Sequence, residues 1–199
     1  MTDARTRRRR GRRPRLRRPS GVLDTLSPVE SAAVLRTLLE RHPGLETEAE
    51  QVAAGLVGEI SAEELAGYLR TSLLLLGYDD LNARSGVCSG TYLDATDAAW
   101  ELLGEVVDPE IQDMKHRRHL GLAEAAESMC IGIVRGLYEA GAADSGDIIA
   151  WAPDFPLETA HRVIETLLDA SPEEEREAVR ARLLAALEHH APGWNMSKR

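Results

Sequence analysis

Aromatic residues are scarce in this chain. Its 199 residues include one Phe, four Tyr and three Trp, an aromatic share of 4%. Segments that alternate apolar and polar residues, as a half-buried strand requires, are missing as well. The core must therefore consist mainly of Leu, Ala, Val and Ile, and Leu and Ala are strong helix formers. These two absences predict an all-α fold.

Cysteine and long apolar runs are also scarce. Cys88 and Cys130 are the only two cysteines, and their spacing does not form a Cys-x-x-Cys metal pair. No segment approaches the roughly 20 apolar residues that span a bilayer, and no apolar run of signal-peptide length follows the basic N-terminus. We therefore expect a cytoplasmic protein with no membrane partner, in which both cysteines are thiols.

Lysine is the third scarce residue. The chain has 2 lysines and 22 arginines, a bias typical of a GC-rich bacterial genome. Ten arginines and Asp3 give residues 1–20 a net charge of +9, whereas the other residues carry 14 basic and 32 acidic side chains, a net charge of −18. Charge asymmetry of this kind predicts a tail that is separate from the folded body.

The charge distribution suggests three parts. We expect a disordered Arg-rich tail at residues 1–21, a single all-helical domain at residues 22–190, and a disordered C-terminus at residues 191–199. As an alternative, residues 1–21 are a mis-assigned start and translation begins near Val22, because upstream DNA of a GC-rich genome readily encodes Arg, Gly and Pro.

Helix starts are recognisable from capping residues. Residues 27–30 (Ser-Pro-Val-Glu) and 61–64 (Ser-Ala-Glu-Glu) match the capping box, and residues 171–174 (Ser-Pro-Glu-Glu) begin the last helix. Asp108 followed by Pro109 matches an N-cap with a first-turn proline, and it predicts a helix boundary there. With the apolar spacing, these signals predict eight or nine helices, over about 28–42, 46–57, 61–76, 94–107, 109–120, 122–140, 148–151, 157–168 and 172–188.

Short connections predict that these helices pair as antiparallel hairpins. They form either a helical bundle or a short solenoid-like stack of the tetratricopeptide or HEAT kind. Gly121 and Glu124 match the start of a tetratricopeptide helix, but Ala123 and Cys130 replace its aromatic residues, so no family is assigned. On the most apolar predicted helix, residues 132 and 136 are both glycine, and this spacing predicts close approach of a neighbouring helix.

The strongest candidate for a specific site is a predicted long loop at residues 77–93. Arg84 and the backbone near Ser85 could contact an anion or a partner, and Cys88 could be a reactive thiol beside that arginine. A plain connecting loop is the preferred interpretation. No partnering histidine is identified for Cys88, so no catalytic residue is assigned.

A second candidate is the segment of residues 151–156, in which Trp151 and Phe155 stand among prolines. Exposed aromatics of this kind anchor protein–protein interfaces. The preferred alternative is that both side chains pack between two helices.

Two helical patterns resemble metal-ligand spacing: Glu158 with His161, and Asp113 with His116. At about 100° per residue these side chains point away from the apolar faces of their helices. We therefore predict no metal and no cofactor. The basic run at residues 115–119 is interpreted as an exposed, solvated helix face.

The Arg-rich tail is the candidate nucleic-acid contact. Guanidinium groups bind phosphate backbones without reading sequence, and residues 1–20 contain no aromatic residue for base stacking. The arginines assigned to this contact are Arg7, Arg8, Arg9, Arg10, Arg12 and Arg13.

The function that the sequence favours is a non-enzymatic protein-interaction or scaffold module, whose partner is another protein. The first alternative is a nucleic-acid-associated protein that binds through the tail. The second is an enzyme that uses the reactive loop cysteine.

Overall fold

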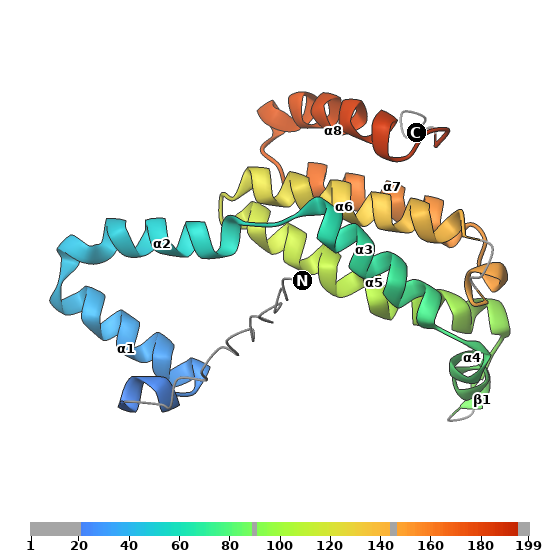
Figure 1. Ribbon diagram of the computed structural model, residues 1–199, viewed down its shortest axis with the longest axis horizontal. Helices are drawn as coiled ribbons and strands as arrows, with labels where there is room; N and C mark the ends of the chain where they lie inside the picture. The colour runs from blue at the N-terminus through green and yellow to red at the C-terminus, as the bar shows by residue number, and fades with distance from the viewer. Residues whose placement is uncertain (1–20, 89–90, 144–146, 195–199) are drawn as a thin grey trace, which may run out of the picture. The chain divides into compact units, whose positions relative to one another are not determined.

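The computed structural model describes residues 21–88, 91–143 and 147–194 (Figure 1). These residues form eight α-helices and one antiparallel pair of three-residue strands, which confirms the predicted all-α class. The helices are α1 (Pro28–Arg41), α2 (Glu46–Gly58), α3 (Ala62–Leu75), α4 (Tyr78–Arg84), α5 (Ala95–His119), α6 (Ala123–Gly141), α7 (Phe155–Asp169) and α8 (Arg176–His190). The strands are β1 (Gly86–Cys88) and β2 (Thr91–Leu93), and short 3-10 turns lie at Val22–Thr25, Pro43–Leu45, Ile149–Trp151 and Glu173–Glu175.

The chain divides into two compact units, Met1–Glu50 and Gln51–Arg199. The described part of the first unit contains α1 and the start of α2. Every core residue identified in the described part of the chain belongs to the second unit. The expected boundaries at residues 21 and 190 stay predictions.

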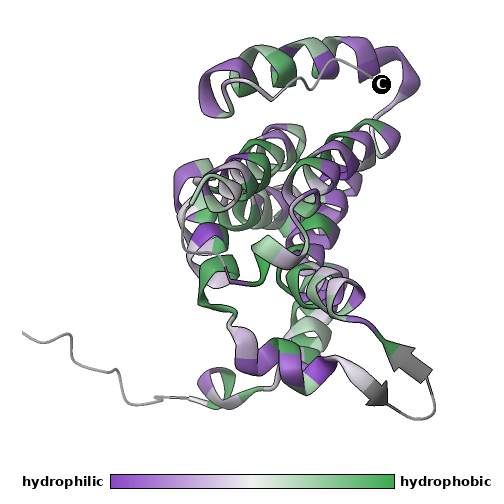
Figure 2. Cartoon of the chain, turned by 90° about the vertical axis from the view of Figure 1, so that its right-hand side faces the viewer, coloured by the Kyte–Doolittle hydropathy of each residue, from purple (hydrophilic) through white to green (hydrophobic). Residues whose placement is uncertain are grey.

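Helix α6 is the centre of the second unit. It packs against α3, α5, α7 and α8, and it buries Met129, Cys130, Ile133 and Leu137 (Figure 1). Figure 2 shows hydrophobic and hydrophilic residues on different sides of the helices, as expected for amphipathic elements around a shared core. No helix in the described part of the chain combines the length and the apolar character that crossing a membrane requires.

The contact between α3 and α6 depends on two glycines. A Cβ atom added to Gly132 would lie 2.8 Å from the carbonyl oxygen of Ala62, and one added to Gly136 would lie 3.0 Å from that of Ala66. Both neighbours are backbone atoms, so the two helices could not approach as closely with larger residues. The predicted close approach at residues 132 and 136 is confirmed.

Pro109 does not begin a helix, and the predicted boundary at Asp108 is wrong. Pro109 lies inside the 25-residue helix α5, with its ring exposed. Val107, Ile111 and Met114, on both sides of the proline, are buried in one core. Because this face is packed on both sides of the proline, the helix continues past Pro109 although that residue lacks an N–H donor.

The predicted long loop at residues 77–93 is also wrong, because this segment contains α4 and both strands. Asp80 starts α4 by accepting a hydrogen bond from the Gly77 N–H at 2.9 Å. The Ser85 N–H donates to the Leu81 carbonyl at 2.8 Å and closes the helix. Gly86 follows with a φ of +105°, a conformation that favours glycine, and pairs with Leu93.

The start of the last helix differs from the prediction as well. Helix α8 begins at Arg176 after a 3-10 turn, and Ser171 does not cap it. The Ser171 hydroxyl instead donates to the Leu167 carbonyl at 2.8 Å and accepts from Nε of Arg118 at 3.0 Å. Arg118 is 8% exposed and also pairs with Glu175, so the basic run at residues 115–119 is not a fully solvated face.

Candidate interaction surfaces

The first candidates are two separate apolar helix faces: one on α1, in the first unit, and one on α2, whose exposed Val52 and Leu56 belong to the second unit. None of the residues in these two helices, all of which the structure describes, is buried. Large apolar side chains with exposed fractions from 47% to 80% lie on them: Val29, Leu35, Leu38, Val52 and Leu56. Both helices therefore present apolar side chains without a core of their own.

Local hydrogen bonds define the start of α1. The Ser27 hydroxyl accepts from the Glu30 N–H at 3.3 Å, and the Glu30 carboxylate accepts from the Ser27 N–H at 2.8 Å. The hydrogen bonds from the backbone and side chain of Ser27 lower the pKa of Glu30. Capping sets where this helix begins, but isolated helices of about 12–15 residues are marginal in water. With 14 and 13 residues, α1 and α2 are in that range.

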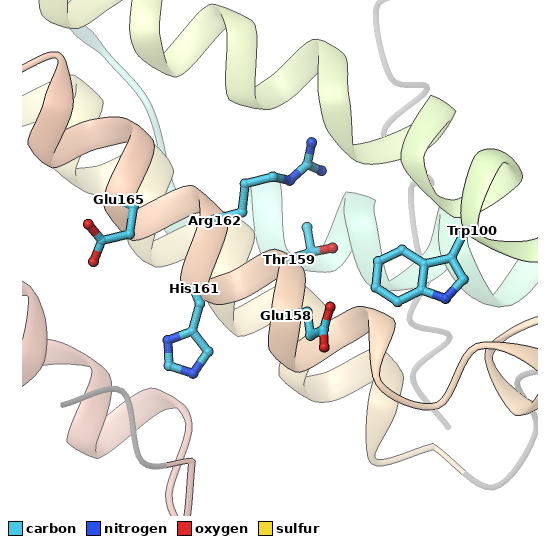
Figure 3. Close-up of a pocket in the computed structure, with 6 residues that line it drawn as sticks. All are labelled: Trp100, Glu158, Thr159, His161, Arg162 and Glu165. Atoms are coloured by element: carbon cyan, nitrogen blue, oxygen red, sulfur yellow. The ribbon is translucent and has the colours of Figure 1, made fainter. Parts of the chain in front are cut away.

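The second candidate surface surrounds Trp100 on α5. Two open hollows share this residue, with volumes of about 370 Å³ and 310 Å³. The first, here called the α4–α5 hollow, is lined by Arg84, Trp100, Glu101, Gly104, Glu105 and Asp108. The second, the α7 hollow, is lined by Trp100, Glu158, Thr159, His161, Arg162 and Glu165 (Figure 3).

Both arginines that line these hollows form ion pairs. Arg84 contacts Glu101 at 3.1 Å and Glu105 at 2.6 Å, and the hydrogen bonds that it donates to Glu105 and Glu101 raise its pKa. Arg162 contacts Asp108 at 2.7 Å and so connects α7 with α5. Both guanidinium groups therefore already have a carboxylate partner.

The α7 hollow contains polar groups that lack a partner. Thr159 is 1% exposed, and its hydroxyl finds no hydrogen-bond partner among the described residues. In Figure 3 its oxygen lies on the side of Trp100. The exposed Glu158 carboxylate also points towards Trp100, and it forms no ion pair within the described part of the chain.

Packing against Phe155 fixes the Trp100 ring. The two ring centroids are 5.0 Å apart, and the rings meet edge to face at 71°. Phe155 is 2% exposed, so its side chain is held in the core, as the packing alternative for residues 151–156 expects. Trp151, by contrast, is 44% exposed and takes no part in the ring contact between Trp100 and Phe155.

The other sequence candidates belong to the end of α4, to β1 and to the N-terminal tail. Arg84 lines the α4–α5 hollow, whereas Ser85 ends α4. Cys88 is the last residue of β1 and pairs with Thr91, but its side chain is outside the description. The tail arginines, Arg7 to Arg13, also lie outside the described residues.

The metal-ligand patterns do not converge in space. Glu158 is exposed and His161 half-exposed on α7, while Asp113 pairs with Arg117 at 3.0 Å on α5. The described residues contain no group of three or more His, Cys, Asp or Glu side chains that could hold a metal ion.

Trp100 was not among the candidate site residues of the sequence. A signal was present, because Trp100, Gly104 and Asp108 are spaced by four residues and share one side of α5. The contribution of Glu158 and Thr159 from α7 depends on how the two helices pack. No protein-family model, curated protein or solved structure matches this chain.

Proposed function

We propose that this protein is a non-enzymatic interaction module that binds another protein through the apolar faces of α1 and α2. The observation that carries the proposal is that both helices lack buried residues while they present large apolar side chains. Contact with a helical partner would remove these side chains from water and stabilise two otherwise marginal helices.

Comparing the free energy of burial with the cost of association favours an interface of several residues over a single contact. Fully burying a Val or Leu side chain contributes about 1.5–3 kcal/mol, and these side chains are about half exposed or more. Association costs on the order of 4–15 kcal/mol in lost freedom of motion. Several residues must therefore be covered together.

The proposed location is the cytoplasm, where Cys130, a buried thiol, would stay reduced. Nucleic-acid binding through residues 1–20 and catalysis at Cys88 stay predictions, because neither rests on a described side chain.

Site-specific photo-crosslinking in native cells tests the proposal. Benzoylphenylalanine replaces Leu35 or Val52 on the apolar faces, and Thr37 or Thr47 as matched controls. At about 100° per residue, Thr37 is about 160° from Leu35, and Thr47 is about 140° from Val52. We expect the two apolar positions to yield the same crosslinked protein and the two control positions to yield none.

A crosslinked product of twice the chain mass would identify a second copy as the partner. Equal crosslinking from all four positions would contradict the proposal. So would crosslinks confined to a single chain, because they would show that the apolar faces are covered from within.

A further inference from the structure

We propose that the α7 hollow beside Trp100 binds the guanidinium group of an arginine in a basic segment of a partner protein. This site lies on α5 and α7, and it does not depend on the function proposed for α1 and α2.

The charge of the surface favours a cation. Five carboxylates and two guanidinium groups line the two hollows that share Trp100. Both guanidinium groups are already paired, with Glu101, Glu105 and Asp108. An anionic ligand would meet unpaired negative charge at Glu158, whereas a cationic ligand would neutralise it.

Both groups without partners can accept hydrogen bonds from a ligand that only donates them. Glu158 offers carboxylate oxygens, and the buried Thr159 hydroxyl offers lone pairs that no described residue uses. A buried polar group without a partner costs about 1–3 kcal/mol. A ligand that donates a hydrogen bond to Thr159 therefore gains more free energy than a ligand that donates to an exposed group. A guanidinium group has five N–H donors and no acceptor.

Trp100 is the third group of the site, after Glu158 and Thr159, that suits a guanidinium ligand. Tryptophan has the aromatic ring that binds cations best, and planar guanidinium groups stack on such rings. Because Phe155 holds the indole edge to face at 5.0 Å, the ring needs little reorganisation to receive a ligand. In Figure 3 the Glu158 carboxylate points towards this ring, so one group could stack and form an ion pair together.

Titration of the full chain with three synthetic peptides tests the assignment. The peptides share one sequence with three basic positions that are arginine, lysine or the neutral isostere citrulline. The readout is the indole N–H signal of Trp100 in NMR spectra, assigned with Trp100→Phe, and the signals of Trp151 and Trp194 serve as internal references. We expect the arginine peptide to shift the Trp100 signal, the lysine peptide to bind more weakly, and the citrulline peptide to leave it unchanged.

Two variants locate the binding group. Glu158→Gln removes an exposed charge without disturbing the core, and we expect about two- to fivefold weaker binding of the arginine peptide, the range of an exposed ion pair. Glu177→Gln, an exposed acid on α8, is the matched control and should bind as the original chain does. Equal weakening by both variants would overturn the proposal, because it would indicate only general charge attraction.

Further results would also overturn it. These are an equal response to lysine and arginine, a response to citrulline, or a shift of Trp100 with inorganic phosphate but not with the arginine peptide. The chain's own arginines are tested by replacing Arg7, Arg8, Arg9, Arg10, Arg12 and Arg13 with Gln. A shift of the Trp100 signal on that change alone, without peptide, would overturn the assignment to a separate partner.

Discussion

Alanine at Gly132 or Gly136 is expected to destabilise the second unit, although alanine forms helices better than glycine. Intrinsic propensity alone would stabilise α6 by about 1 kcal/mol for each change. The added Cβ at residue 132, however, would lie 2.8 Å from the Ala62 carbonyl oxygen and 3.1 Å from the Ala62 Cα. These are backbone atoms, so relief requires α3 to move as a whole.

Overpacking of a well-filled contact costs typically 1–3 kcal/mol, and sometimes more. Because this cost opposes the gain in propensity, we expect a net loss of about 1–2 kcal/mol for each single variant. A shift of α3 that accommodates one methyl group also makes room for the other. The double variant should therefore lose less than the sum of the two single variants, as is usual for residues that share a neighbour.

Gly67→Ala provides the matched control. Gly67 lies on α3, it is exposed, and a Cβ there would meet no atom within 4 Å. This change should stabilise the protein by about 0.5–1 kcal/mol.

Urea unfolding followed by tryptophan fluorescence measures these differences. Trp100, Trp151 and Trp194 all belong to the second unit, so the signal reports the unit that contains α3 and α6. If Gly132→Ala proves as stable as Gly67→Ala, the argument from close backbone approach is refuted.

Three further variants test other features of the fold. Pro109→Ala should stabilise α5 by about 1–3 kcal/mol, because it restores an N–H donor inside the helix; an unchanged urea midpoint would contradict this. Ser171→Ala should cost about 1–3 kcal/mol in the same assay, because it leaves the buried Nε of Arg118 without its partner, and a loss near zero would argue against that network. Burial raises the pKa of the Cys130 thiol, so in a Cys88→Ser variant a thiol reagent at pH 8 should label Cys130 only after unfolding. Rapid labelling of the native protein would show that this site opens.

The helices that the sequence predicts most accurately are those with local start signals. Ser27 and Ser61 accept hydrogen bonds from the N–H groups three residues ahead, so the first turn of α1 and of α3 is set by neighbours in the chain. The failure at Ser171 has a physical reason. Its hydroxyl is used by Arg118, 53 residues away, and no local pattern can report a competing partner at that distance.

The candidate surfaces also differ in how far the sequence predicts them. Apolar stripes on α1 and α2 are visible in the sequence, but the stripes on α3 and α6 look similar and are buried. The sequence did not place Trp100 at a hollow, because its ring contact Phe155 and the lining residues Glu158 and Thr159 come from α7.

Composition and local spacing alone were enough to predict an all-α protein, most helix starts and the close approach at Gly132 and Gly136, because these follow from residues within one or two turns. Only the tertiary structure decided that α5 continues through Pro109, that Arg118 is buried, and that an indole, a carboxylate and a buried hydroxyl meet in one hollow. Each of these depends on contacts between residues far apart in the chain, whose packing energy outweighs the local preference.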